Sequence, residues 1–239
     1  APFYIRASRI GFQGVATEYE DISQTLGLSP LRSFFRLTLP LHAATSIVWP
    51  AVAKLMRDYP DISVELSIDS GMRDIVADRF DAGVRLGEQV ARDMIAVRIG
   101  PDARMVAVGS PAYFQRYGRP KSPSDLQSHN CIGLRQSSGR LYAWELQRKG
   151  EAEIKVQVSG QLIFNNSYSC LSAAVEGLGL AFIPQDLAEA DLQAGRLEIV
   201  LDEWSLPFPG FYLYYPTVTQ PSPAFSLLVE ALRSKPKAR

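Results

Sequence analysis

Hydrophobic residues near the start of the chain recur at alternating intervals of three and four. They are Phe12, Val15, Tyr19, Ile22 and Leu26. This spacing is typical of a helix with one apolar stripe, and Gly27 and Pro30 are residue types that end a helix. Such a helix needs a partner surface, which is either the body of the same protein or another chain, and the pattern leaves both open.

From residue 34 onward, stretches with the pattern of strands alternate with stretches of helical spacing. The first half predicts strands at 34–40, 61–69, 81–86, 95–100 and 104–109, with helices at 43–60 and 70–80. The second half predicts strands within 152–166 and at 180–184 and 211–216, and helices at 110–118, 167–179, 184–197 and 222–233. Strands that alternate with helices predict parallel pairing and an α/β fold.

Serine–proline pairs and glycines mark the predicted helix ends. Ser110-Pro111 and Ser222-Pro223 each place an N-cap before a first-turn proline, and Gly118 follows the end of the first of these helices. The glycines of "EGLGLAF", Gly177 and Gly179, are expected to end a helix and not to bind a dinucleotide, because they follow the helix instead of starting it. Pro50 is expected near a first turn, where its missing N–H does little harm.

Composition excludes several classes of protein. The 25 basic and 25 acidic residues give a net charge of zero, which argues against nucleic-acid binding by this chain itself. No apolar run is long enough to span a membrane, and "APFYIRASRIGFQG" does not read as a signal peptide. Cys131 and Cys170 are far apart and are expected to be buried free thiols. We therefore expect a cytoplasmic protein.

Groups for catalysis are scarce in this sequence. His42 and His129 are the only histidines, and neither is near a cysteine or a paired carboxylate at ligand spacing. Neither a phosphate-binding loop of the G-x-x-x-x-G-K-[ST] type nor a G-x-S-x-G nucleophile elbow is present. We expect no catalytic residues, no metal site and no cofactor, and hence a protein that is not an enzyme.

Three turns at the junctions of strands and helices are candidates for ligand binding. They are "PLHAATS" at 40–46, "DSGM" at 69–72 and "NNSYS" at 165–169. Ligands of open parallel sheets bind at the carboxyl ends of strands, where helix N-termini favour anions. The candidate residues are Leu41, His42, Ala43, Ser70, Gly71, Asn165, Asn166 and Ser167. Ordinary helix capping explains any one turn, whereas their joint occurrence favours a binding site.

Two arginines extend this candidate site. Arg85 ends the apolar strand "DAGVRL", where it either grips a ligand carboxylate or forms a structural ion pair with Asp69, Asp74 or Asp81. Under the first hypothesis, Arg85→Ala weakens carboxylate binding and leaves the fold intact. Arg135, in "CIGLRQSSG", is the counterpart in the second half, and simple surface exposure is the alternative for it.

Four ordered stretches resemble the effector-binding domain of LysR-type transcriptional regulators. "RLTLPLHAATSIVWPAVAKLMRDYPDISVELSID" is similar to the first strand, long helix and second strand of that family, and "FDAGVRLG" is similar to its D-x-[AG]-[VI]-R-x-G strand. "MVAVGSPAYFQRYGRPKSPSDLQSHNCI" and "AAVEGLGLAFIPQDLA" resemble its entry into the second subdomain and its glycine-containing helix–strand turn. Together the stretches cover about residues 34–235, and their order makes the resemblance specific.

The resemblance implies an α/β fold of two Rossmann-like subdomains, of the periplasmic-binding-protein type II, with a cleft between them. It assigns residues 31–107 and 216–239 to subdomain I and 108–215 to subdomain II. Residues 1–30 would form a linker helix region that pairs with the same helix of a partner. The winged helix-turn-helix head of the family has no counterpart in this chain, which favours a fragment of a longer regulator.

The function implied is that of a sensor whose cleft binds a small organic effector, a carboxylate or aromatic acid, to control transcription by the parent protein. The expected partners are this effector and further copies of the chain in a homodimer or homotetramer. DNA would be bound only through the missing head, and no membrane is expected to take part. A solute-binding protein of a transport system is the alternative, because it would share the fold.

Overall fold

The computed structural model describes residues 33–71, 73–87, 93–217 and 222–233. Contacts divide the chain into unit 1, Ala1–Pro101 with Pro209–Arg239, and unit 2, Asp102–Phe208. The chain thus leaves unit 1 after residue 101 and returns to it at residue 209. From the sequence, these two boundaries were predicted after residue 107 and at residue 216. The predicted linker region at 1–30 lies outside the described residues.

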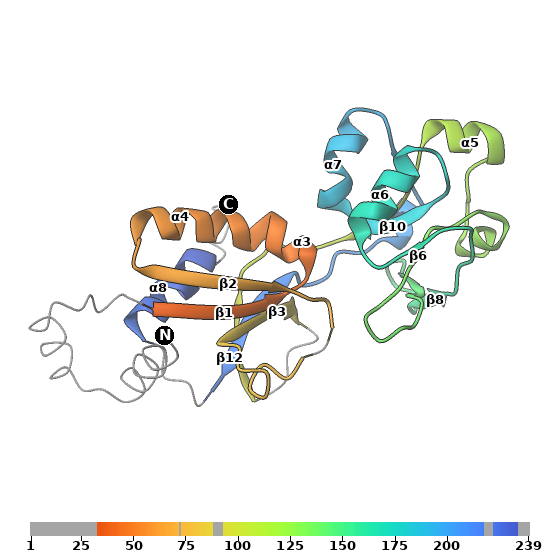
Figure 1. Ribbon diagram of the computed structural model, residues 1–239. Coiled ribbons are helices and arrows are strands. Elements are labelled where there is room, and N and C mark those ends of the chain that lie inside the picture. The colour runs from red at the N-terminus through yellow and green to blue at the C-terminus, as the bar shows by residue number, and fades with distance from the viewer. Residues whose placement is uncertain (1–32, 72, 88–92, 218–221, 234–239) are drawn as a thin grey trace, which may run out of the picture. The chain divides into compact units, whose positions relative to one another are not determined.

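Unit 1 is built on one five-stranded sheet with the order β2-β1-β3-β12-β4 (Figure 1). The strands are β1 (Ser33–Leu39), β2 (Ile62–Ile68), β3 (Ala82–Leu86), β4 (Met94–Arg98) and β12 (Phe211–Pro216). β1 pairs in parallel with both β2 and β3, as the alternation of strands and helices predicted. β12 runs antiparallel to β3 and β4, because it enters the sheet as the chain returns from unit 2.

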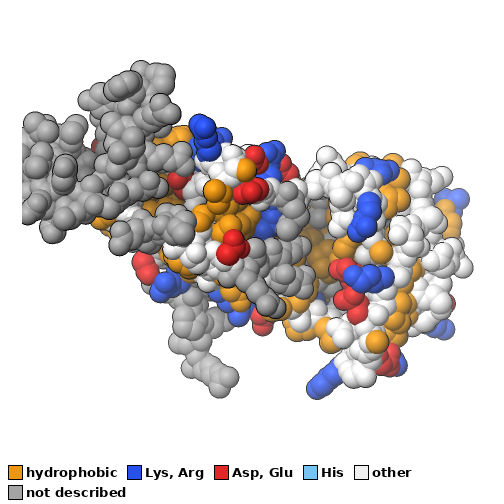
Figure 2. Space-filling view, turned by 90° about the horizontal axis from the view of Figure 1, so that it is seen from below, with side chains coloured by type: hydrophobic (Ala, Val, Ile, Leu, Met, Phe, Trp, Pro, Cys, Tyr) orange, Lys and Arg blue, Asp and Glu red, His pale blue; other side chains and the backbone are white. Residues whose placement is uncertain are grey.

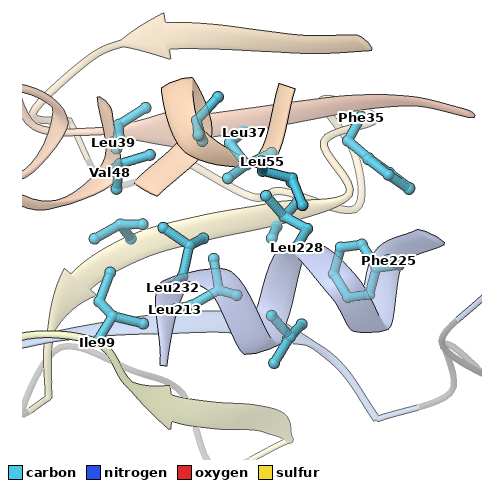
Figure 3. Packing of buried hydrophobic residues seen from close by; sticks show 14 of the residues in the cluster. Phe35, Leu37, Leu39, Val48, Leu55, Ile99, Leu213, Phe225, Leu228 and Leu232 are labelled. Atoms are coloured by element: carbon cyan, nitrogen blue, oxygen red, sulfur yellow. The ribbon is translucent and has the colours of Figure 1, made fainter. Parts of the chain in front are cut away.

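The core of unit 1 lies between this sheet and two helices. Alternate residues of β1, namely Phe35, Leu37 and Leu39, point from the sheet into this core (Figure 3). The facing side chains come from α4 (Trp49–Asp58) and α8 (Pro223–Leu232), including Leu55 and Leu228. Burial of this apolar face stabilises the sheet and fixes where its strand ends lie.

The helical run after β1 begins earlier than expected. It starts as α3 (Leu41–Ala43), continues through a π-helical segment (Ala44–Val48) and becomes α4. Pro50 lies in the first turn of α4, but helical residues precede it, so it does not mark the start of the run. π-helical turns inside helices are frequent at functional sites.

The helix predicted at 70–80 is wrong. Residues 75–79 form turns, and Arg79 has a φ of 58°, which a helix does not allow. The carboxylate of Asp74 accepts hydrogen bonds from the N–H groups of Val76 and Ala77, at 3.0 and 3.1 Å. Asparagine and aspartate compete in this way with helical bonding, and here the local turn is favoured.

Unit 2 contains several small sheets. Its strands are β5 (Met105–Gly109), β6 (Gly133–Leu134), β7 (Trp144–Leu146), β8 (Ile154–Val156), β9 (Ile163–Phe164), β10 (Ala181–Pro184) and β11 (Glu198–Val200). Its helices are α5 (Pro111–Tyr117), α6 (Ser167–Val175) and α7 (Gln185–Gln193), with short 3₁₀ turns at Pro123–Ser128 and Asp202–Trp204. β5 pairs antiparallel with β10 and β11, so parallel pairing does not hold throughout the chain.

The helix caps predicted at Ser110, Ser222 and Gly118 are confirmed. Ser110 Oγ accepts the N–H of Tyr113 at 3.2 Å, and Ser222 Oγ accepts the N–H of Phe225 at 3.1 Å. Gly118 lies past α5 with a φ of +76°, a value that glycine adopts at low cost. Capping is local in sequence, which is why a sequence pattern identifies it.

Both cysteines are buried and free, as predicted. Burial raises the pKa of Cys131 to about 12 and that of Cys170 to about 11. Thiolate is the reactive form of cysteine, so neither residue offers a nucleophile near neutral pH.

Charged side chains of both signs lie among hydrophobic ones on the surface that Figure 2 presents. Several exposed charges of the protein pair with each other, for example Arg119 with Glu198 and Lys155 with Glu145. Within the described helices, none is long and apolar enough to cross a membrane.

Candidate functional site

The carboxyl ends of β1, β2 and β3 lie at the same edge of the unit 1 sheet. In the parallel register Leu39 is opposite Ile68, and Thr38 is opposite Gly83, so each strand points the same way. The helix start within 40–46, the turn at 69–71 and Arg85 therefore belong to this one edge. A hydrogen bond from the N–H of Asp69 to the carbonyl of Leu39, at 2.9 Å, joins the turn at 69–71 to the end of β1.

The helical run after β1 begins at this edge without a side-chain cap. Pro40 occupies the N-cap position and has no side chain that can accept a hydrogen bond. The first N–H groups of a helix have no partner within it, so those of Leu41 and Ala43 are available at the edge. The side chain of Ala43 packs in the core and only its backbone can take part.

Arg85 is almost fully buried at this edge, with an exposed fraction of 2%. Its Nη1 donates to the carbonyl of Val84 at 2.9 Å and to that of Asp69 at 3.5 Å, and its Nη2 donates to the carbonyl of Gly71. Burial lowers the pKa of Arg85, and the nearby Tyr214 and Asp69 oppose that effect. The guanidinium thus holds the turn at 69–71 against the end of β3.

The described residues show no ion pair between Arg85 and the three aspartates considered from the sequence. Asp69 pairs with Arg73 at 2.7 Å instead, and Asp81 accepts the N–H of Arg36 at 2.8 Å. A hydrogen bond from the N–H of Gly71 is the main cause that lowers the pKa of Asp69, and the bond from Arg73 adds to it. Arg85 therefore binds backbone carbonyls, which neither sequence hypothesis had included.

Sequence reasoning missed the groups that enclose Arg85. The ring of Tyr214 lies against Gly83, where an added Cβ would be 2.4 Å from Tyr214 Cζ. Burial raises the pKa of Tyr214, and the charge of Arg85 lowers it. Gly83 and Arg85 are two apart in β3 and so share one face of the sheet, and Tyr214 is opposite Gly83 in β12. The alternation within "DAGVRL" could have shown that Gly83 and Arg85 share a face, but it could not have shown that β3 pairs with β12.

In unit 2, α6 begins at the carboxyl end of β9. Asn166 is its N-cap, and its Oδ1 accepts the N–H of Ser169 at 2.9 Å. Asn165 is exposed, and Ser167, the first residue of α6, is half-buried. The N–H groups at the start of this helix make a second edge that suits an anion.

Arg135 follows β6 in unit 2. It is exposed, which is the alternative to a role in ligand binding that the sequence left open. Its N–H donates to the carbonyl of Phe164 at 2.6 Å, next to Asn165, so β6 and β9 bring these two candidate residues together. Its Nη1 donates to the carbonyl of Gly139 at 2.7 Å. The guanidinium thus supports the turn that follows it.

His129 belongs to a separate polar cluster in unit 2. Tyr113 Oη lies 3.1 Å from His129 Nδ1 and accepts the N–H of Asn130 at 3.0 Å. The Tyr113 hydroxyl can donate to Nδ1 only if that nitrogen carries no proton. Partial burial lowers the pKa of His129 below its ordinary value of 6.5, and Asp125 opposes this shift.

Stability is expected to fall as the pH is lowered through this histidine's range. In the unfolded chain His129 takes up a proton near pH 6.5, whereas the folded chain binds it only at lower pH. The unfolded state therefore binds more protons in this window, and the free energy of unfolding decreases with decreasing pH. Urea unfolding of the wild type and His129→Gln between pH ~7 and ~5.5 measures this contribution. An equally steep pH dependence in both proteins would contradict it.

The described residues contain no group of three or more His, Cys, Asp or Glu side chains placed to hold a metal ion. Unit 1 and unit 2 each have a sheet edge where strands end and the N–H groups of a helix begin. Such edges bind ligands in α/β proteins without requiring catalytic groups.

Solved structures define the fold class. The regulatory domain of AphB from Vibrio vulnificus matches with a TM-score of 0.69 and 22% identity over 85% of this chain and 98% of that chain. The regulatory domain of CrgA from Neisseria meningitidis matches with a TM-score of 0.66 and 22% identity over 84% of this chain and 99% of that chain. The fold is thus that of LysR-type regulatory domains, the periplasmic-binding-protein type II fold.

The family follows from the sequence itself. The model of the LysR substrate binding domain matches residues 30–237, and the chain belongs to this family. A relative in Pseudomonas aeruginosa that carries the name of a transcriptional regulator is 49% identical over 92% of this chain and 73% of its own length. The HTH-type transcriptional regulator PgrR of Escherichia coli is 43% identical over 84% of this chain and 67% of its own length. The protein is therefore the effector-binding domain of a LysR-type transcriptional regulator and not an enzyme.

Proposed function

We propose that this domain binds a small organic carboxylate and thereby controls transcription by a DNA-binding parent protein. The observation that carries the proposal is the uncapped helix start at Leu41, which lies at the carboxyl end of β1 beside the turn at 69–71. Its N–H groups and dipole favour an anion. The start of α6, with Asn165, Asn166 and Ser167, offers a second set of such groups.

Within this proposal the candidate residues have different roles. Leu41 and Ala43 contribute backbone N–H groups, and Ser70, Asn165 and Ser167 contribute side chains that are exposed or half-buried. Arg85 is a positioning residue, because its N–H groups hold the turn that carries Ser70 and Gly71. Its positive charge, which no described carboxylate pairs with directly, also favours an anion at this edge.

A ligand can change the activity of the parent protein only through its different affinity for two states of that protein. We propose that the parent acts as a homodimer or homotetramer in the cytoplasm and contacts DNA through a head domain outside these residues. Family membership favours this regulator over the alternative of a transport protein.

Calorimetric titration with benzoate and succinate tests the proposal, with benzamide and succinamide as neutral matches. We expect at least one acid to bind and its amide to bind at least about tenfold more weakly, because the helix N–H groups favour a negative charge. Asn165→Asp keeps the shape of the side chain and adds a negative charge, so it should weaken binding of that acid by about tenfold.

Gln161→Glu is the matched control for this substitution. Gln161 is exposed in the same unit, and the change adds the same charge outside the proposed site. Equal binding of acid and amide would contradict the proposal, as would acid binding that Asn165→Asp leaves unchanged.

A further inference from the structure

Unit 2 contains a pocket of about 480 Å³ beside the β7–β8 ribbon. Its polar lining consists of Gln136, Arg140, Tyr142, Glu145, Lys155 and Gln157. Glu145 and Lys155 are opposite each other on the outer face of the ribbon, because Trp144, Leu146 and Val156 point into the core. None of these residues belongs to the strand-end edges proposed to bind the effector.

One part of the pocket wall is fixed by hydrogen bonds and stacking. Glu145 accepts the hydroxyl of Tyr142 at 2.8 Å through one carboxylate oxygen and Lys155 Nζ at 2.7 Å through the other. The ring of Tyr142 stacks on Phe182 at 6.4 Å between centroids, and Trp144 stacks on the same ring at 5.3 Å. The charge of Glu145 is thus paired and its position is set.

The other part of the pocket wall has polar side chains that form no hydrogen bond with other described side chains or backbone groups. The turn from Gln136 to Arg140 is closed by the backbone bond from the N–H of Gln136 to the carbonyl of Arg140 at 2.9 Å and is supported by the Arg135 side chain, which donates to the carbonyl of Gly139. Within the described part of the chain, the side chains of Gln136, Arg140 and Gln157 form no hydrogen bond or ion pair. The pocket therefore presents one guanidinium and two carboxamides to a ligand.

These groups indicate the chemical class of ligand that the pocket can bind. A guanidinium binds a carboxylate through two parallel N–H groups, and a carboxamide both donates to and accepts from an amide. Lys155 pairs with Glu145 and also, at 3.3 Å, with Glu153, which lies outside the pocket lining. Arg140 is therefore the cation of this lining that pairs with no described carboxylate, and a single negative charge on the ligand matches it. Leu141 and Ala143 supply apolar contact for the remaining atoms.

We propose that this pocket is a second ligand site, separate from the effector site, for small carboxylic acids that carry an amide group. The carboxylate binds Arg140, and the amide binds Gln136 and Gln157. The adjacent pocket along β8, lined by Pro123, Ile154 and Trp204 among others, is mainly apolar, and its one charged lining residue is Lys155, which already pairs with Glu145.

Two-dimensional NMR of the deuterated, ¹⁵N-labelled chain tests this site with N-acetylglycine as the probe. We expect saturable shifts of the side-chain amide signals of Gln136 and Gln157, which report contact at the pocket itself. N-acetylglycinamide, which lacks the charge, should bind at least about tenfold more weakly. Arg140→Gln should weaken N-acetylglycine binding by about tenfold as well, and since Arg140 is exposed the variant should melt like the wild type.

Arg116→Gln is the matched control, since it removes an exposed arginine of the same unit that lies over the ring of Tyr117. It should leave N-acetylglycine binding unchanged. Shifts that do not saturate, or that Arg140→Gln leaves unchanged, would overturn the second site. Asn165→Asp separates the two proposals, because it should affect the effector acid and not the shifts of Gln136 and Gln157.

Discussion

Replacement of Arg85 by alanine is expected to destabilise unit 1 strongly. The side chain is 2% exposed and donates to the carbonyls of Asp69, Gly71 and Val84. Truncation leaves buried carbonyl groups without their donor and a cavity between the turn and the sheet. A buried group left unsatisfied costs about 1–3 kcal/mol, and of the three bonds only that to Val84 is fully buried, while those to Asp69 and Gly71 are partly buried and cost less. We therefore expect a total loss of about 2–4 kcal/mol. At about 2–4 °C per kcal/mol, the melting temperature should fall by roughly 5–15 °C.

Arg73→Ala is the control for this prediction. Arg73 pairs with Asp69 in the same turn, but its side chain is 43% exposed, and exposed ion pairs contribute about 0–1 kcal/mol. Thermal unfolding of the two variants measures the difference. If Arg85→Ala melts like Arg73→Ala, Arg85 does not hold the turn. From the sequence, Arg85→Ala was predicted to leave the fold intact. The burial of Arg85 argues against that prediction, and the same melting experiment tests it.

Replacement of Gly179 by alanine is the second substitution with a large expected effect. A Cβ at this position would lie 2.4 Å from the backbone oxygen of Asn130. That oxygen accepts the N–H of Leu180 at 2.9 Å, so it cannot move away without loss of the bond. Relief of the clash requires a backbone shift next to β10, and overpacking of this kind costs about 1–3 kcal/mol. Urea unfolding should show a corresponding decrease in stability.

Gly195→Ala separates this clash from the general cost of replacing a glycine. Gly195 has a φ of +68°, but a Cβ there would meet nothing within 4 Å. Its replacement should cost about 1 kcal/mol, from backbone strain alone. Equal losses in the two variants would show that the close approach of Gly179 to Asn130 is unimportant.

The two glycines of "EGLGLAF" illustrate what sequence can and cannot reveal. Both were predicted to end a helix, and Gly177, with a φ of +76°, lies just past α6 as expected. Gly179 is needed for a different reason, because residues about fifty positions earlier pass close to its backbone. A cap depends on neighbours in sequence and leaves a pattern, whereas a close approach depends on tertiary packing.

The same distinction explains the outcome for the strands and for the candidate site. The parallel pairing of β1 with β2 was predicted from the alternation of strands and helices, but the antiparallel pairing of β5 with β10 and β11 joins distant segments that periodicity does not relate. For Arg85, the sequence identified a buried arginine at a strand end, and the carbonyls it binds lie up to sixteen residues away. The residue could be selected from its pattern, but its partners could not.

The order of strands in unit 1 has a consequence for synthesis of the protein on the ribosome. β4 pairs only with β12 among the described strands, and β12 also completes the edge of β3, so the sheet β2-β1-β3-β12-β4 stays incomplete until residues 211–216 emerge. Unit 2 is one continuous segment, 102–208, and takes on the order of 10 s to translate. The edges of β3 and β4 that pair with β12 therefore stay unpaired for as long as unit 2 is being translated.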